Sequence, residues 1–94
     1  MKKNLLIVED HELTRFGLKT TFEDVDYIES IYEASSAEEA IEVFKNNAVD
    51  IVIMDLGLPN MNGIDATQVI RALNSDVKVI ILTSHNDEKE VLNS

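Results

Sequence analysis

Three short apolar runs divide this chain, and two of them lead directly into acidic residues. Residues 5–8 are followed by Glu9 and Asp10, and residues 51–54 are followed by Asp55. Runs of this length are typical of strands that are covered on both faces of a parallel sheet. Because ligands of such sheets bind beyond the carboxyl ends of the strands, we expect the carboxylates to meet at one sheet edge.

Carboxylates gathered at one place repel each other. Two unit charges about 4 Å apart cost on the order of 4 kcal/mol at an effective dielectric near 20. A cation must offset this repulsion, or one carboxyl must retain its proton. Glu9, Asp10 and Asp55 therefore predict a metal and phosphate site.

Helical patterns alternate with the apolar runs. The third run, residues 77–82, predicts another strand, and residues 27–34 predict a weaker edge strand. Ser36 and Glu39 have the spacing of a capping box. Three helical faces are predicted by Leu13, Phe16, Thr20 and Thr21, by Ala37, Ala40, Ile41, Phe44 and Ala48, and by Ala66, Val69, Ile70 and Leu73. This alternation predicts an α/β fold with a doubly wound parallel sheet.

Composition narrows the functional classes. We expect the 94 residues to form one domain, residues 1–94. A formal net charge of −10 argues against direct binding to nucleic acid and to anionic membranes. No apolar run is long enough to cross a bilayer, and the absence of cysteine excludes disulfides and thiolate zinc sites. We expect a cytoplasmic protein.

The motifs and their order resemble the receiver domain of two-component response regulators. The resemblance covers essentially the whole chain and implies a flavodoxin-like sheet with strand order 2-1-3-4. Its most specific part is the sequence Asp-Leu-x-Leu-Pro-x-Met-x-Gly, which begins at Asp55. The other parts are Glu9 and Asp10 after the first strand, and Thr83 and Ser84 after the fourth.

This resemblance implies a phosphoacceptor module, not an enzyme. Asp55 would attack the phosphorus of a phosphohistidine on a histidine kinase and form an acyl phosphate. Asp10, with Glu9 acting directly or through water, would hold Mg²⁺ together with Asp55 and the backbone carbonyl of Gly57. Thr83 would donate a hydrogen bond to a phosphoryl oxygen.

The loop after the third strand has two shaping residues. Pro59 fixes its φ angle, and Gly63 permits φ angles that are closed to other residues. We expect these residues to turn the chain sharply into the third helix.

The chain departs from the family pattern at its end. The family continues with a fifth strand and a fifth helix, which carry a lysine and an aromatic residue of the phosphorylation site. Without them, residues 77–82 would form an exposed apolar edge, which predicts self-association, and phosphorylation would be impaired. Residues 10–18 are similar to receivers that precede a helix-turn-helix region, which suggests a transcription regulator.

Two other functions are compatible with these residues. The first is a module that only assembles and is not phosphorylated, which the missing lysine and aromatic residue favour. The second is a metal-dependent phosphatase that forms an aspartyl-phosphate. That reading is weaker, because Leu56, Gly57 and Leu58 follow Asp55 where such enzymes need a second acid.

Simpler structural roles exist for several of these residues. Glu9 and Asp10 could cap the first helix, and Thr83 could cap a later one. His11 and His85 are of a type that binds metals and carries protons. Since both lie where the family tolerates varied residues, we favour no chemical role for them.

Overall fold

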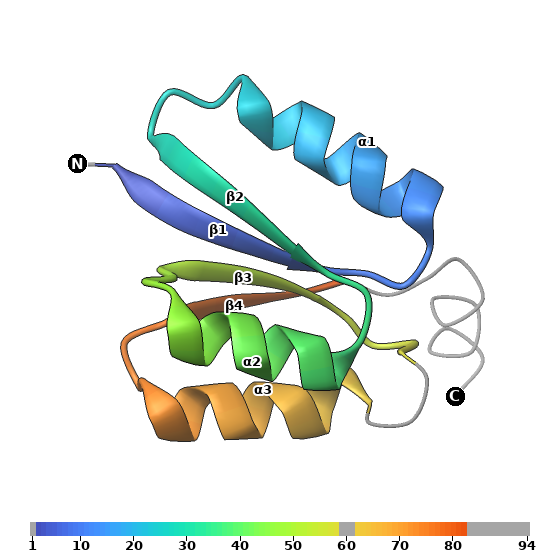
Figure 1. Ribbon diagram of the computed structural model, residues 1–94, viewed down its shortest axis with the longest axis vertical. Helices are drawn as coiled ribbons and strands as arrows, with labels where there is room; N and C mark the ends of the chain where they lie inside the picture. The colour runs from blue at the N-terminus through green and yellow to red at the C-terminus, as the bar shows by residue number, and fades with distance from the viewer. Residues whose placement is uncertain (1, 59–61, 83–94) are drawn as a thin grey trace.

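The computed structural model describes residues 2–58 and 62–82, in which strands and helices alternate (Figure 1). The strands are β1 (Lys3–Val8), β2 (Ile28–Ala34), β3 (Ile51–Asp55) and β4 (Lys78–Leu82). The helices are α1 (Glu12–Glu23), α2 (Ala37–Asn46) and α3 (Gly63–Leu73). All strand pairs are parallel, and the sheet order is β2-β1-β3-β4. The predicted doubly wound α/β fold and its order 2-1-3-4 are confirmed.

The strand ends differ slightly from the apolar runs. β1 begins at Lys3, because Lys3 and Asn4 already pair with β2 across a register shift. β4 begins at Lys78, because the N–H of Val77 bonds to the carbonyl of Asn74 in the preceding turn. Asp55 belongs to β3 itself, since it pairs with Leu82. Backbone pairing therefore sets these limits more than hydrophobicity does.

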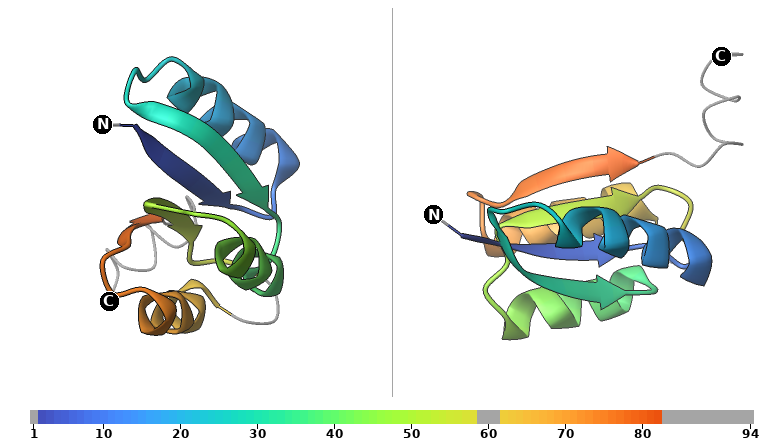
Figure 2. Two further views of the ribbon diagram at one scale, coloured as in Figure 1. Left: turned by 60° about the vertical axis from the view of Figure 1, so that its left-hand side comes forward. Right: turned by 90° about the horizontal axis from the view of Figure 1, so that it is seen from above.

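Successive residues of the central strands face opposite layers. Leu6, Val8, Val52 and Met54 pack against α2 and α3, whereas Leu5, Ile7 and Ile53 pack toward α1. Figures 1 and 2 show this arrangement, with α1 on one face of the sheet and the other two helices on the opposite face. The uninterrupted apolar runs of β1 and β3 follow from this double coverage.

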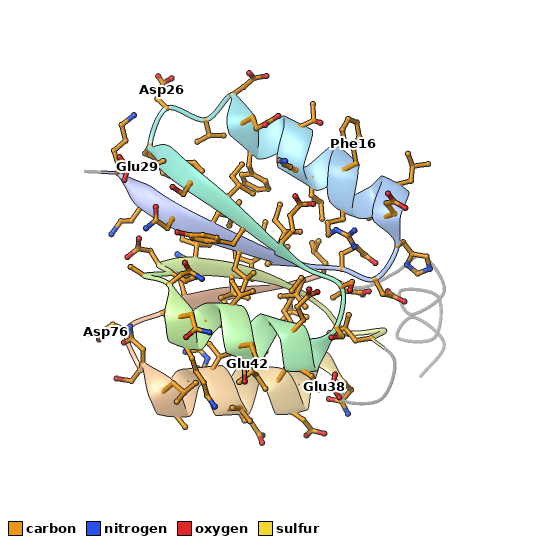
Figure 3. The ribbon with its side chains drawn as sticks, in the orientation of Figure 1. Phe16, Asp26, Glu29, Glu38, Glu42 and Asp76 are labelled. Atoms are coloured by element: carbon orange, nitrogen blue, oxygen red, sulfur yellow. The ribbon has the colours of Figure 1, made fainter. Side chains whose placement is uncertain are left out.

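The predicted inner face of α1 is wrong. Leu13 is 83% exposed and Phe16 is 64% exposed, and Figure 3 shows Phe16 on the outer side of the helix. The side chains that pack toward the sheet are Leu18 and Phe22. Both faces of this helix carry large apolar residues, so periodicity alone could not identify the inner face.

The other two helical faces are partly as predicted. Ala37, Ala40 and Phe44 of α2 and Ala66 and Ile70 of α3 are buried, whereas Ala48, Val69 and Leu73 are exposed. Ser36 Oγ accepts the N–H of Glu39 at 3.1 Å, which confirms the predicted cap. The Glu39 carboxylate returns to the N–H of Ser35 at 2.6 Å, one residue earlier than a capping box requires.

β4 forms one margin of the described sheet. It pairs with β3, and Ile80 and Ile81 are exposed in the part of the chain that the structure describes. The expectation that residues 77–82 are covered on both faces therefore fails for these two side chains. Within the same residues, none of the helices has the length and apolarity that a bilayer crossing requires.

Candidate metal centre

Parallel pairing brings the acidic residues together at the carboxyl ends of β1 and β3. Val8 lies opposite Met54, so the residues that follow them, Glu9 and Asp55, emerge side by side. One ligand atom from each of four residues lies within 4.8 Å of the others, and the four are Glu9, Asp10, His11 and Asp55. The structure thus brings Glu9, Asp10 and Asp55 together.

Asp55 is the more deeply placed carboxylate of the cluster. Only 3% of its surface is exposed, compared with 6% for Glu9. Burial raises the pKa of Asp55, while a hydrogen bond from the Gly57 N–H to Oδ1, at 3.0 Å, lowers it. The carboxylates of Glu9 and Asp10 raise this pKa further. A cation at the cluster would oppose these effects and favour ionised Asp55.

Glu9 is anchored by its neighbours. Its N–H bonds to the carbonyl of Ala34 on β2 at 3.0 Å. Its Oε2 atom accepts the backbone N–H of His11 at 2.9 Å. His11 is the N-cap of α1 and makes no side-chain cap bond, so Glu9 supplies part of that function. The simpler role of Glu9 at the helix start therefore coexists with its place in the acidic cluster.

His11 joins the cluster, although the sequence favoured no chemical role for it. Its Nδ1 lies 2.9 Å from Oε2 of Glu9 and 3.3 Å from Oδ1 of Asp10. The hydrogen bond to Glu9 raises the pKa of His11, and the charge of Asp10 adds to the effect. The sequence signal for this role was the acidic pair Glu9 and Asp10 directly before His11, because nearby carboxylates favour the protonated form of a histidine.

Arg15 was also missed by sequence reasoning. Its Nη1 donates a hydrogen bond to the backbone oxygen of Glu9 at 2.8 Å, and its Nε donates to Glu33 on β2 at 3.2 Å. The second contact depends on how α1 lies against β2. Helical spacing alone does not reveal that arrangement.

The donor set fits a hard divalent cation. Oδ1 of Asp10 is buried and has no hydrogen-bond partner among the described residues. Buried carboxylate oxygens without a donor are costly unless a cation or a proton satisfies them. Oxygen ligands of this kind suit Mg²⁺. Asp10, Asp55 and Glu9 could therefore hold such an ion.

The remaining predicted site residues divide into two groups. Gly57 is exposed and donates its N–H to Asp55, so a role for its carbonyl as a metal ligand stays a prediction. Thr83, Ser84, His85 and Pro59 lie outside the described residues.

Gly63 shapes the loop for a different reason from the one expected. It does not lie in the left-handed φ region that favours glycine. A β-carbon on Gly63 would instead lie 2.5 Å from the backbone oxygen of Asp55 and 3.0 Å from Cγ of Met54. Close packing, and not a special φ angle, accounts for the glycine.

Comparison with known proteins identifies the family. The family described as the response regulator receiver domain matches residues 5–94. The chain belongs to this family. The response regulator UvrY of Escherichia coli strain K12 is 43% identical over 84 residues, which are 89% of this chain and 38% of UvrY. This receiver chain therefore spans about two fifths of that relative's length.

Solved structures agree with the receiver fold. A LuxR-family two-component response regulator from Aurantimonas sp. SI85-9A1 is 32% identical, with a TM-score of 0.84 over 98% of this chain and 66% of that one. The CheX-CheY-BeF3-Mg+2 complex from Borrelia burgdorferi contains a chain that is 29% identical. Its TM-score is 0.79, over 97% of this chain and 71% of that one.

Proposed function

We propose that this receiver domain accepts a phosphoryl group on Asp55. The observation that carries the proposal is the convergence of Glu9, Asp10 and Asp55 within one cluster in a chain of this family. The name of the Borrelia complex includes both beryllium trifluoride and Mg²⁺, which supports a phosphate and metal site in related chains.

The proposed donor is a phosphohistidine on a histidine kinase. A carboxylate oxygen of Asp55 would form a bond to phosphorus while the bond from phosphorus to the imidazole nitrogen breaks. The electron pair of the broken bond returns to the imidazole, which regains a proton from solvent. Only ionised Asp55 can attack, and its pKa is raised. A positive charge at the site must therefore lower this pKa before the transfer. We propose that this reaction takes place in the cytoplasm.

Asp10 and Asp55, with Glu9 directly or through water, are the proposed holders of Mg²⁺. We add the carbonyl of Gly57 as a ligand and Thr83 as a donor to the phosphoryl group, both from the family resemblance. When bound, the ion would neutralise charge on the transferring phosphoryl group. Glu9 would also keep its hydrogen bond to the N–H of His11.

Intact mass spectrometry with acetyl phosphate and Mg²⁺ tests the proposal. We expect a single phosphoryl adduct on the wild-type chain and none on Asp55→Asn. Glu42→Gln is a matched control, because Glu42 lies exposed on α2, away from the cluster, and should still be labelled (Figure 3). If the wild-type chain stays unlabelled while the UvrY receiver is labelled, the reading as an assembly module without phosphorylation is favoured instead.

We also propose that the receiver associates with a second copy along β4. The exposed Ile80 and Ile81 support this, since an apolar edge strand favours pairing with another chain. Light scattering should show a dimer that Ile80→Glu disrupts. Ile64→Glu, which changes an exposed isoleucine on α3, should not disrupt it. A monomer at all concentrations would contradict the proposal.

The output of the complete protein is a further proposal. LiaR of Bacillus subtilis, a relative named as a transcriptional regulatory protein, is 39% identical over 87 residues. We therefore propose transcription control through a region beyond this receiver. The net charge of −10 still predicts that the receiver itself does not bind nucleic acid.

A further inference from the structure

Arg15 connects three elements beside the metal centre. It lies on α1, it donates a hydrogen bond to the backbone of Glu9 just after β1, and it pairs with Glu33 on β2. Nη1 lies 2.8 Å from the backbone oxygen of Glu9, and Nε lies 3.2 Å from Oε1 of Glu33. The guanidinium therefore contacts the backbone from which Asp10 extends.

The contact with Glu9 fixes the direction of the next peptide. The carbonyl of Glu9 and the N–H of Asp10 belong to one planar unit. The N–H of Glu9 is already held by Ala34 at 3.0 Å. With Arg15 on the carbonyl as well, both backbone polar groups of Glu9 have partners. This leaves the peptide before Asp10 little freedom to rotate.

Arg15 is better placed for this role than the nearby Lys19. Both basic groups reach the carboxylate of Glu33, since Nζ of Lys19 lies 3.4 Å from Oε2. The Arg15 side chain is 19% exposed, compared with 39% for Lys19, so solvent screens its contacts less. The planar fork of arginine also lets one side chain serve two acceptors in a fixed geometry.

We propose that Arg15 is a positioning residue for the cation site. By holding the Glu9–Asp10 peptide plane, it keeps the Asp10 carboxylate turned toward Asp55. This inference rests on the proposed function, in which Asp10 and Asp55 share one Mg²⁺. Glu33 takes part indirectly, because it holds the guanidinium in place from β2.

If Arg15 acts only through its charge, its loss should change Mg²⁺ affinity in the opposite direction from the change expected if it acts by positioning Asp10. A positive side chain near the site repels a divalent cation, so its removal should tighten Mg²⁺ binding if charge alone matters. Loss of a positioning contact should weaken binding, because Asp10 then has to be ordered when the ion binds. The sign of the change in Kd therefore separates the two.

Isothermal titration of the full chain with Mg²⁺ provides the test. We expect Arg15→Met to raise the Kd about tenfold, at the lower end of what loss of an outer contact to a metal ligand costs. Lys19→Met removes a charge from the same Glu33 partner without touching Glu9, so its Kd should stay equal or fall. A Kd for Arg15→Met equal to or below the wild-type value would overturn the inference.

Two further measurements separate the possible failures. If wild type binds no Mg²⁺, or Asp10→Asn binds it as well as wild type does, the proposed metal site fails. If Asp10→Asn abolishes binding and Arg15→Met does not weaken it, only the role of Arg15 fails. Unfolding in EDTA shows whether each variant is folded.

Arg15→Lys carries the test if Arg15→Met does not fold. It keeps the charge, but its single amine cannot serve both acceptors in the same geometry. Its Kd for Mg²⁺ should rise above the wild-type value, because part of the positioning contact is lost. An unchanged Kd would contradict the proposal.

Discussion

Gly63 lies directly against the backbone oxygen of Asp55. A β-carbon at this position would be 2.5 Å from that oxygen and 3.1 Å from the Cα of Leu56. The start of α3 can therefore approach the end of β3 only if residue 63 has no side chain. This close packing joins the start of α3 to the backbone of Asp55, the proposed phosphoacceptor.

Gly63→Ala should destabilise the protein. The added methyl meets backbone atoms that cannot move away as a side-chain end could, so we expect a loss of about 1–3 kcal/mol in the free energy of unfolding. Urea denaturation measures this change. Gly17→Ala is the matched control, because nothing lies within 4 Å of a β-carbon there. Within α1, this second change should stabilise the protein by roughly 0.5–1 kcal/mol. Equal effects of the two variants would contradict the packing argument.

Asp55→Asn should stabilise the metal-free protein increasingly as pH rises. Burial raises the pKa of Asp55 in the folded state above its ordinary value of 3.8. The folded state then binds more protons than the unfolded state between those two pKa values, so ionised Asp55 lowers stability as pH rises through that window. Asparagine does not ionise and avoids this loss.

Urea unfolding in EDTA at several pH values measures this difference. Near pH 3 ionisation of Asp55 should contribute little to the difference in stability between the two proteins, because Asp55 is protonated in both the folded and the unfolded wild type. At pH 7 the asparagine variant should be the more stable one. Saturating Mg²⁺ should reduce its advantage, since an ion that binds only the folded wild type stabilises it. A stability difference that is independent of pH would count against burial as the cause.

The imidazole of His11 should titrate above its ordinary pKa of 6.5 in the metal-free protein. The hydrogen bond to Glu9 is the main cause of this rise. Because the pKa of His11 is higher in the folded state, protonated His11 stabilises the protein below pH 6.5, and this contribution is lost as pH rises through the pKa of the folded state. Proton NMR can follow the ring resonances, and His11→Gln assigns them. Excess Mg²⁺ should lower this pKa toward 6.5, because the ion adds positive charge beside the ring. An unchanged titration would mean that no ion binds the cluster.

Ser36→Ala should cost about 1 kcal/mol of stability, as loss of a side-chain N-cap commonly does. Its Oγ accepts the N–H of Glu39 at 3.1 Å. Ser35→Ala is the closest control, because it removes only a hydroxyl bond to Glu39 and keeps the N–H that the same carboxylate accepts. Thermal unfolding of the two variants should therefore rank Ser36→Ala as the less stable. The reverse order would show that the Glu39 carboxylate matters more than the Ser36 hydroxyl.

Apolar and helical patterns along the chain were enough to predict the strands, but not the order of the strands in the sheet. Each buried strand contributes an apolar run, and the family resemblance supplies the order. The inner face of α1 could not be predicted in this way, because the helix carries large apolar residues on two faces. Leu13 and Phe16 lie on the exposed face, and Leu18 and Phe22 lie on the face that packs against the sheet. Only the packing of α1 on the sheet decides between them.

For the candidate site, the order of residues along the chain already determined which acids would meet. Glu9 and Asp10 follow β1, Asp55 is the last residue of the adjacent parallel strand β3, and parallel pairing aligns the ends of such strands. The tertiary structure decided what surrounds them. His11 and Arg15 reach Glu9 because α1 starts directly after Glu9 and Asp10 and lies beside β2. Side-chain hydrogen bonds of this kind depend on distances between elements, which a local sequence pattern does not specify.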